Sequence, residues 1–243
     1  YMFSKNDSFD TLTLSGDLQD AYTLKHLENV WVMLFNMDIN DSLIFKETPN
    51  YIAKTDKNGA FHFYNLKDKN YKIVALTGSD FIYNNEEKMA FSDNILNAKT
   101  DSFISLFAFD PIIEIDSIIR DSIELRSDSI IYSSLLQDSI EKKEELSSGK
   151  LEIITNKSSP CIFQLFQNGE VINKFHFAHT PYIINKIVPG KYNLKYIADN
   201  NQDSIWNTGN WEMRIQPEKA VNYYSEITIR SNWDLELEWI IVK

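Results

Sequence analysis

Oxygen-bearing side chains are spaced through residues 199–210 in a pattern that suits a calcium ion. They stand at positions 1, 3, 5 and 9 of a calcium-binding loop: Asp199, Asn201, Asp203 and Asn207. The carbonyl of Ile205 falls at position 7, and Ca²⁺ prefers hard oxygen ligands. Position 12 is Asn210 in place of a bidentate Glu, position 6 is Ser204 in place of Gly, and no EF-hand helices flank the loop. The pattern therefore predicts either a calcium site or an Asx-rich loop closed by its own side-chain hydrogen bonds.

Two tryptophans lie in the same region. Trp206 and Trp211 flank Asn207-Thr208-Gly209-Asn210. Indole faces on loops stack on sugars or anchor a protein partner. The sequence thus predicts a binding site of Trp206, Trp211, Asn207 and Asn210, with the alternative that Trp206 folds back to cover the end of a sandwich.

No residue pattern indicates catalysis. Gly-x-Ser-x-Gly, a P-loop and a Rossmann fingerprint are all absent. His176 and His179 are three apart on an expected strand and would point to opposite faces. Cys161 is the one cysteine, lies in an apolar run, and is expected to be an inert core residue. We expect a protein that is not an enzyme and that has no cofactor beyond the calcium named above.

Composition and charge limit the number of domains and the classes of partner. The chain has 243 residues, of which 43% are hydrophobic, and a formal net charge of −11. That length and apolar content suit two domains, each with its own core. The acidic balance repels phosphate backbones, so we expect no nucleic-acid partner. No apolar run approaches the ~18 residues that a membrane-spanning helix needs.

Strand patterns fill residues 9–109, the first expected domain. Period-two or continuous apolar runs mark the expected strands: 11–14, 30–35, 51–55, 60–64, 71–76 and 103–109. The run at 30–35 is apolar on both faces, as in a central strand. Asn58-Gly59 predicts a hairpin turn, because both residues accept positive φ, and Gly16 is taken as a turn after the first strand.

Residues 110–148 differ in composition from the expected domains on either side, and we expect them to form an acidic, Ser-rich linker. Asp-Ser-Ile occurs there four times at irregular intervals, which argues against a solenoid repeat. A helix is expected over residues 128–147, with Asp128 as its cap and Gly149 at its end.

The second expected domain covers residues 149–243. Its strands are expected at 151–154, 161–166, 171–177, 192–198 and 233–239, with a hairpin turn at Asn168-Gly169. In the last strand Trp233, Leu235, Leu237 and Trp239 alternate with acidic residues, which is typical of a half-buried antiparallel strand. The two halves also share a local pattern: Leu66 precedes Tyr71 as Ile187 precedes Tyr192, and Glu-Lys recurs at 87–88 and 218–219. This echo indicates a duplicated sandwich.

The first half resembles the transthyretin-like, or carboxypeptidase regulatory-like, family of seven-stranded sandwiches. The resemblance is carried by residues 14–18, 27–34, 53–63 and Tyr71, about 65 residues in all. Lys69 stands where the family usually has Gly. The resemblance implies an all-β fold of two antiparallel sandwiches in tandem, joined by the partly helical linker.

The stretch from Tyr192 to Trp239 resembles the C-terminal region of Bacteroidota-type Ig-like-domain-containing envelope lipoproteins. It is carried by Tyr192–Asn201, Trp206–Asn210, Gln216–Lys219 and Ile229–Glu236. This resemblance implies a location outside the cytoplasm, in the periplasm or at the cell surface, associated with an outer membrane. Because the chain starts at Tyr1 without a Met, signal peptide or lipid-attachment Cys, we expect a mature or truncated piece, or one part of a longer chain. The resemblance also implies a lipid anchor on an N-terminal region that precedes this piece.

The expected function is therefore a non-catalytic structural or protein-interaction module. Its partners are expected to be envelope or outer-membrane proteins, recognised by loops and strand edges. A carbohydrate-binding module that uses the loop tryptophans is the alternative.

Overall fold

The computed structural model describes residues 11–78, 83, 87–111, 148–157 and 160–241. Over these residues the chain has sixteen strands and one short 3₁₀ helix, Asp41–Leu43. The expected all-β class is confirmed. The helix expected over residues 128–147 lies outside the described residues.

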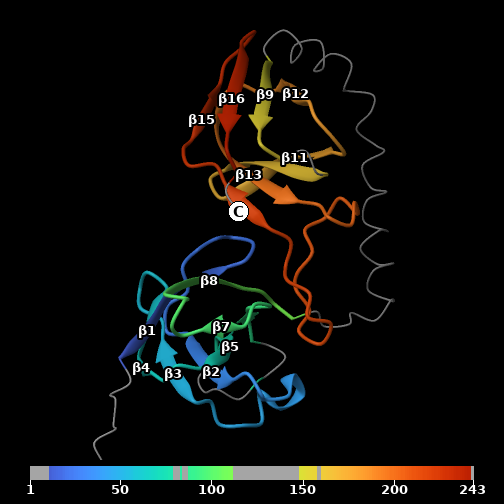
Figure 1. The fold of residues 1–243 in the computed structure, drawn as a ribbon. Helices are drawn as coiled ribbons and strands as arrows, with labels where there is room; N and C mark the ends of the chain where they lie inside the picture. The colour runs from blue at the N-terminus through green and yellow to red at the C-terminus, as the bar shows by residue number, and fades with distance from the viewer. Residues whose placement is uncertain (1–10, 79–82, 84–86, 112–147, 158–159, 242–243) are drawn as a thin grey trace, which may run out of the picture. The chain divides into compact units, whose positions relative to one another are not determined.

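Two compact units divide the strands between them (Figure 1). The first contains β1 to β8, with the bounds Leu12–Asp20, Trp31–Asn36, Tyr51–Lys54, Ala60–Leu66, Asn70–Leu76, Met89–Phe91, Leu96–Asn97 and Phe103–Ala108. The second contains β9 to β16, with the bounds Gly149–Thr155, Cys161–Gln167, Glu170–Phe177, Tyr182–Ile187, Gly190–Ala198, Ala220–Asn222, Ile227–Ile229 and Asp234–Trp239. The sequence assigned all of residues 149–243 to the second domain, whereas Thr208–Pro217 belong to the first unit.

Each unit is a sandwich of two sheets with the same strand order. In the first, a three-stranded sheet β4-β1-β8 accompanies a five-stranded sheet β3-β2-β5-β6, in which β7 also pairs with β5. In the second, β12-β9-β16 accompanies β11-β10-β13-β14, in which β15 also pairs with β13. β2 is central, as its two-sided apolar run predicts. The matching orders agree with a duplicated unit.

Each sandwich has its core between its two sheets. The first core includes Leu14, Leu18, Val32, Leu34, Phe61 and Ile73. The second includes Leu151, Phe163, Leu165, Tyr182, Tyr196 and Trp239. Alternate residues of β1 and β16 enter these cores, which is the period-two burial expected of strands covered on one face.

One strand pair in each sandwich is parallel, which the sequence did not predict. β1 runs parallel to β8, and β16 runs parallel to β9, with Leu235 opposite Leu151 and Leu237 opposite Ile153. The remaining pairs between strands are antiparallel. The alternation in β16 correctly predicted one buried face, but burial of a face does not report the direction of the neighbouring strand. Trp233 precedes this strand and is exposed.

A buried tyrosine fixes the same corner in each sandwich. The hydroxyl of Tyr71 donates to the carbonyl of Lys67 at 3.1 Å, and that of Tyr192 donates to the carbonyl of Val188 at 2.9 Å. In both cases the acceptor lies four residues upstream of the tyrosine, just before β5 in the first sandwich and β13 in the second. The echo between residues 66–71 and 187–192 thus reflects a tyrosine corner, in which a buried hydroxyl satisfies a backbone carbonyl.

The Asn58-Gly59 turn does not make a hairpin. β3 pairs with β2 and β4 pairs with β1, so the chain passes from one sheet to the other at this turn. Gly59 has φ of 70°, and a Cβ there would meet the carbonyl of Leu18 on β1. Gly59 takes the positive φ that the sequence predicts, whereas Asn58 does not, and the strand after the turn pairs with β1. The hairpin predicted at Asn168-Gly169 is confirmed, with both residues at positive φ between β10 and β11.

Gly16 lies inside β1 and is not a turn residue. It is buried, and a Cβ there would meet the carbonyl of Ile104 and the ring of Phe61. Glycine is needed at this point because the neighbouring strand and an aromatic ring approach the backbone closely.

Candidate functional site

The predicted calcium loop follows β13, and its first carboxylate is buried. Asp199 is 4% exposed. One of its oxygens accepts the backbone N–H of Asp203 at 3.1 Å and the other accepts that of Ser204 at 3.2 Å. Both oxygens therefore hold the turn of the loop, as an Asx-type turn does.

Asn201 and Asn207, two further predicted ligands, both contact the third, Asp203. One of its oxygens accepts the side-chain amides of Asn201 and Asn207, both at 2.8 Å, and the other accepts the N–H of Ile205 at 2.9 Å. Burial raises the pKa of Asp203, but these donors together lower it below its ordinary value. The structure thus brings Asp199, Asn201, Asp203 and Asn207 into one hydrogen-bonded cluster.

Glu218 closes the loop from its other end, and the sequence analysis missed it. Its side chain is buried, with one oxygen accepting the N–H of Asn200 at 2.7 Å and the other that of Asn207 at 3.0 Å. Its carbonyl accepts the indole N–H of Trp206 at 2.8 Å. The recurrence of Glu-Lys before β6 and β14 was the available signal. Counting back from these strands, Glu87 and Glu218 occupy the same position.

Calcium is expected to have little effect on this loop. The oxygens of Asp199 already accept backbone N–H groups, and within the described ranges no group of three or more His, Cys, Asp or Glu side chains could hold a metal. We expect ~5 mM CaCl₂ to shift the melting temperature by less than ~1 °C relative to EDTA, because a ligand stabilises only the state that binds it. A saturable rise of several degrees that disappears in Asp203→Asn would instead assign a calcium site.

The two loop tryptophans belong to different units. Trp206 is half-buried in the second unit, held by its hydrogen bond to Glu218. Trp211 belongs to the first unit, within the inserted segment, which we define as Thr208–Pro217. Trp206 and Trp211 are therefore described separately, each within its own unit.

The inserted segment corresponds to extra length in the second repeat. Leu76 pairs with Met89 in the first sandwich and Ile197 pairs with Ala220 in the second, so residues 77–88 and 198–219 lie between these paired residues and the second stretch is ten residues longer. The inserted segment has the same length. Asn210 shapes it: its side chain accepts the N–H of Met213 at 2.8 Å, and its backbone pairs with Ile215. Asn210 therefore has a structural role in a tight turn.

Within the first unit the inserted segment packs through Trp211. The Trp211 ring lies 5.2 Å from the ring of Phe45 and 5.1 Å from that of Phe91, in tilted and edge-on arrangements. The guanidinium of Arg214 lies 4.3 Å from the Trp211 ring and 4.4 Å from the Phe91 ring. These contacts bury part of the indole and cover one of its faces with a cation.

Polar contacts add to this packing. Gln216 donates its side-chain amide to the carbonyl of Phe91 at 3.0 Å, and Thr208 donates its hydroxyl to that of Asp110 at 2.6 Å. Gly209 lies against Phe109, where a Cβ would meet the aromatic ring. The inserted segment is thus a packed part of the first sandwich.

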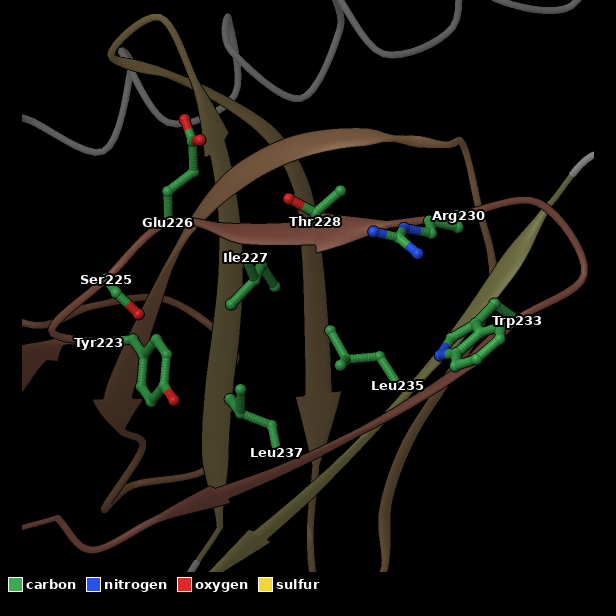
Figure 2. Close-up of a pocket in the computed structure, with 9 residues that line it drawn as sticks. All are labelled: Tyr223, Ser225, Glu226, Ile227, Thr228, Arg230, Trp233, Leu235 and Leu237. Carbon is green, nitrogen blue, oxygen red and sulfur yellow. The ribbon is translucent and has the colours of Figure 1, made fainter.

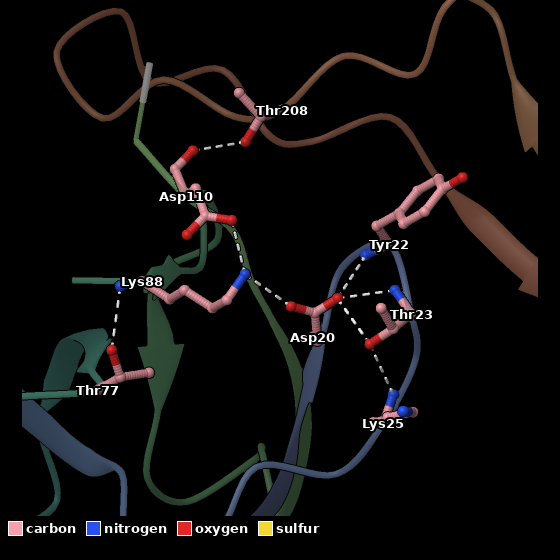
Figure 3. A network of polar contacts seen from close by, with 8 residues as sticks. All are labelled: Asp20, Tyr22, Thr23, Lys25, Thr77, Lys88, Asp110 and Thr208. Atoms are coloured by element: carbon pink, nitrogen blue, oxygen red, sulfur yellow. Dashed lines mark hydrogen bonds and ion pairs between the residues drawn. The ribbon is translucent and has the colours of Figure 1, made fainter. Parts of the chain in front are cut away.

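Close to Thr208, Lys88 joins two aspartates of the first unit (Figure 3). Its ammonium lies 2.9 Å from Asp20 and 2.6 Å from Asp110. The other oxygen of Asp20 accepts the N–H groups of Tyr22 and Thr23 and the hydroxyl of Thr23. Burial raises the pKa of Asp20, but the bonds from Thr23 and Lys88 together lower it below its ordinary value of 3.8.

Replacing Lys88 by methionine is expected to destabilise the first unit by about 2 kcal/mol at pH 7, because it leaves the largely buried Asp20 carboxylate without its cation. The lowered pKa of Asp20 means that its stabilisation is present above pH 3.8 and is lost as the pH falls through the still lower folded-state pKa. The difference between wild type and Lys88→Met should therefore shrink in that acidic range. Lys88 itself has a raised pKa, because the two aspartates outweigh its burial, so the contact persists up to at least pH 10.5.

Urea unfolding at a series of pH values measures this effect, and Lys99→Met is the matched control. Lys99 pairs with Asp68 at 3.7 Å on the surface and should contribute less than ~0.5 kcal/mol. Equal losses for both variants, or a Lys88→Met loss that does not change with pH, would contradict the network described.

Two further reactive groups have defined environments. Ser15 Oγ lies 2.9 Å from His62 Nδ1 on the outer face of β1 and β4, a partner that the sequence did not reveal for His62. Cys161 is buried at the start of β10, and burial raises the pKa of its thiol to about 11. A thiol held protonated in this way is a core residue in character.

Comparisons with known proteins give distant structural similarities only. No family model and no curated protein matches the chain. The chain is similar to GBS52, the minor pilin of Streptococcus agalactiae, with 13% identity, a TM-score of 0.29 and coverage of 95% of each chain. It is also similar to a DUF3823 family protein from Parabacteroides merdae, with 11% identity, a TM-score of 0.28, and coverage of 92% of this chain and 100% of that one. Another DUF3823 family protein, from Bacteroides uniformis, gives 10% identity, a TM-score of 0.29, and coverage of 88% and 98%.

The assignment of two β-sandwiches therefore rests on the strand pairing. In the part of the chain that the structure describes, no helix is long and apolar enough to cross a bilayer.

Proposed function

We propose that this chain is a non-catalytic, extracytoplasmic structural and protein-interaction module, an accessory subunit of an outer-membrane or cell-surface assembly. The observation that carries the proposal is how the carboxylates of the loop after β13 are used. The carboxylates of Asp199, Asp203 and Glu218 all accept hydrogen bonds from the loop itself. The side chains whose types suggested ligand binding are thus used to hold the loop in its fold.

The proposed location follows from the resemblance of Tyr192–Trp239 to envelope lipoproteins. A net charge of −11 suits a basic protein partner more than an anionic surface. Sandwiches present their strand edges and loops to such partners on a rigid scaffold.

Affinity purification of the full chain from native membranes, followed by mass spectrometry, tests this function. We expect a membrane or surface protein to be recovered in stoichiometric amount. Recovery of the chain alone, from the cytosolic fraction, would contradict the proposal.

Carbohydrate binding through Trp206, Trp211, Asn207 and Asn210 is less well supported. The Trp211 ring is packed against Phe45 and Phe91 and has Arg214 over it. A glycan array on the purified chain distinguishes the two functions: sugar binding that is lost in Trp211→Ala would replace the interaction role with carbohydrate recognition.

A further inference from the structure

A groove of about 330 Å³ opens in the second unit between β15 and β16 (Figure 2). Ile227 and the half-exposed Leu235 line it together with the buried Leu237. Tyr223 and the exposed Trp233 lie toward its two ends, as Figure 2 shows. The two strands belong to different sheets, because β15 pairs with β13 and β16 pairs with β9. The groove is therefore a place where the apolar interior of the sandwich reaches the surface at a sheet edge.

β16 is the edge strand at this groove. In the sheet β12-β9-β16 it pairs with β9 along Asp234 to Trp239, and the described part of the chain places no strand on its other side. An extended segment that paired with this edge would continue the sheet. Because side chains alternate along a strand, every second residue of that segment would enter the groove beside Leu235 and Leu237.

The outer face of the same edge is acidic. Asp234, Glu236 and Glu238 alternate with the groove residues and are exposed, and Glu152 of β9 lies opposite Glu236. Lys150 contacts this acidic face, at 3.2 Å from Asp234 and 3.7 Å from Glu152. The intervening residues of an added strand would face these carboxylates, so basic side chains are the complement.

The β15 side of the groove carries both acidic and basic residues, so it does not favour a basic segment as the β16 side does. Glu226 is already paired with Lys191 at 3.0 Å. Arg230 extends along the rim above Leu235, as Figure 2 shows, where its N–H groups can donate to backbone carbonyls of a bound segment. The charge preference therefore comes from the β16 side.

We propose that β16 binds an extended segment of a partner protein in which apolar and basic residues alternate. The apolar residues occupy the groove and the basic ones face Glu236 and Glu238. Acidic residues on an edge also discourage pairing with copies of the same acidic protein, which narrows the partners to basic segments. This inference rests on the proposed interaction function and names the chemistry of the partner.

The test uses the purified full chain and two synthetic peptides, acetylated and amidated, in which Val alternates with Lys or with Glu. Titration calorimetry should show binding of the Lys-Val peptide that weakens as salt is raised, and no binding of the Glu-Val peptide. Hydrogen exchange should show new protection in β16 and none in β8, whose exposed residues Phe103, Ser105 and Phe107 carry no charge.

The decisive variant reverses charge without touching the groove. Glu236→Lys with Glu238→Lys should weaken Lys-Val binding by about tenfold or more, whereas Glu28→Lys with Glu47→Lys, an equal charge change on exposed residues of the first unit, should change it by less than about twofold. Equal affinity for both double variants, absence of Lys-Val binding, or protection outside β16 would overturn the inference. Because the peptides replace the natural partner, such a failure is separate from a failure to recover a membrane protein.

Discussion

Replacing Glu218 by alanine should lower the free energy of unfolding of the second sandwich by about 3 kcal/mol. The substitution removes both acceptors for the N–H groups of Asn200 and Asn207 and leaves these donors without their carboxylate. Glu218→Gln keeps one acceptor oxygen and should lower the free energy of unfolding by less than Glu218→Ala does. Chemical unfolding, with hydrogen exchange at residues 199–207 as the local reporter, measures both effects.

Glu212→Ala is the matched control, because Glu212 lies in the same connection but is exposed. It should change stability by less than ~0.5 kcal/mol. If Glu218→Ala behaved like Glu212→Ala, the loop would be held by something other than the carboxylate that the structure places there.

Trp211→Ala should lower the stability of the first sandwich by about 3 kcal/mol, even though Trp211 lies in sequence between β13 and β14 of the second. The substitution removes the ring contacts with Phe45 and Phe91 and the platform for Arg214. Faster hydrogen exchange is expected at Met89–Phe91, with the strands β9 to β12 unchanged.

Met213→Ala provides the comparison for Trp211→Ala within the inserted segment. Met213 is 68% exposed, so its truncation should leave exchange at Met89–Phe91 as in the wild type. An effect of Trp211→Ala confined to the second sandwich would contradict the assignment of Thr208–Pro217 to the first unit.

Local pattern predicted much of the fold. The apolar run of β2 predicted a central strand, and the alternation in β16 predicted its buried face. The echo around Tyr71 and Tyr192 indicated a duplication, which agrees with the shared strand order. In each case the information lies within a few residues, where burial dictates the residue type.

Sheet membership could not be read in the same way. Asn58-Gly59 has the local chemistry of a hairpin, yet β3 and β4 join different sheets. The short strands β6 and β7 were missed because three and two residues carry no measurable period. Gly16 looked like a turn residue, although its smallness serves a close approach by Ile104 and Phe61.

The sequence predicted which oxygen-bearing residues of the loop lie together, but it did not predict their hydrogen-bond partners. The spacing of Asp199, Asn201 and Asp203 correctly marked a cluster of oxygen atoms, and the structure shows amide groups bound to them. Glu218 was missed because its partners Asn200 and Asn207 lie 18 and 11 positions earlier, a separation that no local motif covers. Trp211 looked like an exposed ligand platform because its packing partners are distant in sequence.

The proposed role is that of an interaction module that acts through the open edge at β16. Site-specific photocrosslinking in intact cells tests it most directly, with p-benzoylphenylalanine placed at the exposed Trp233 beside the groove and, as control, at the exposed Ile172 of the edge strand β11. We expect position 233 to give one crosslinked product whose partner peptide is an extended segment of alternating apolar and basic residues, and position 172 not to give it. The same product from both positions, or no protein crosslink from position 233, would contradict binding at the β16 edge.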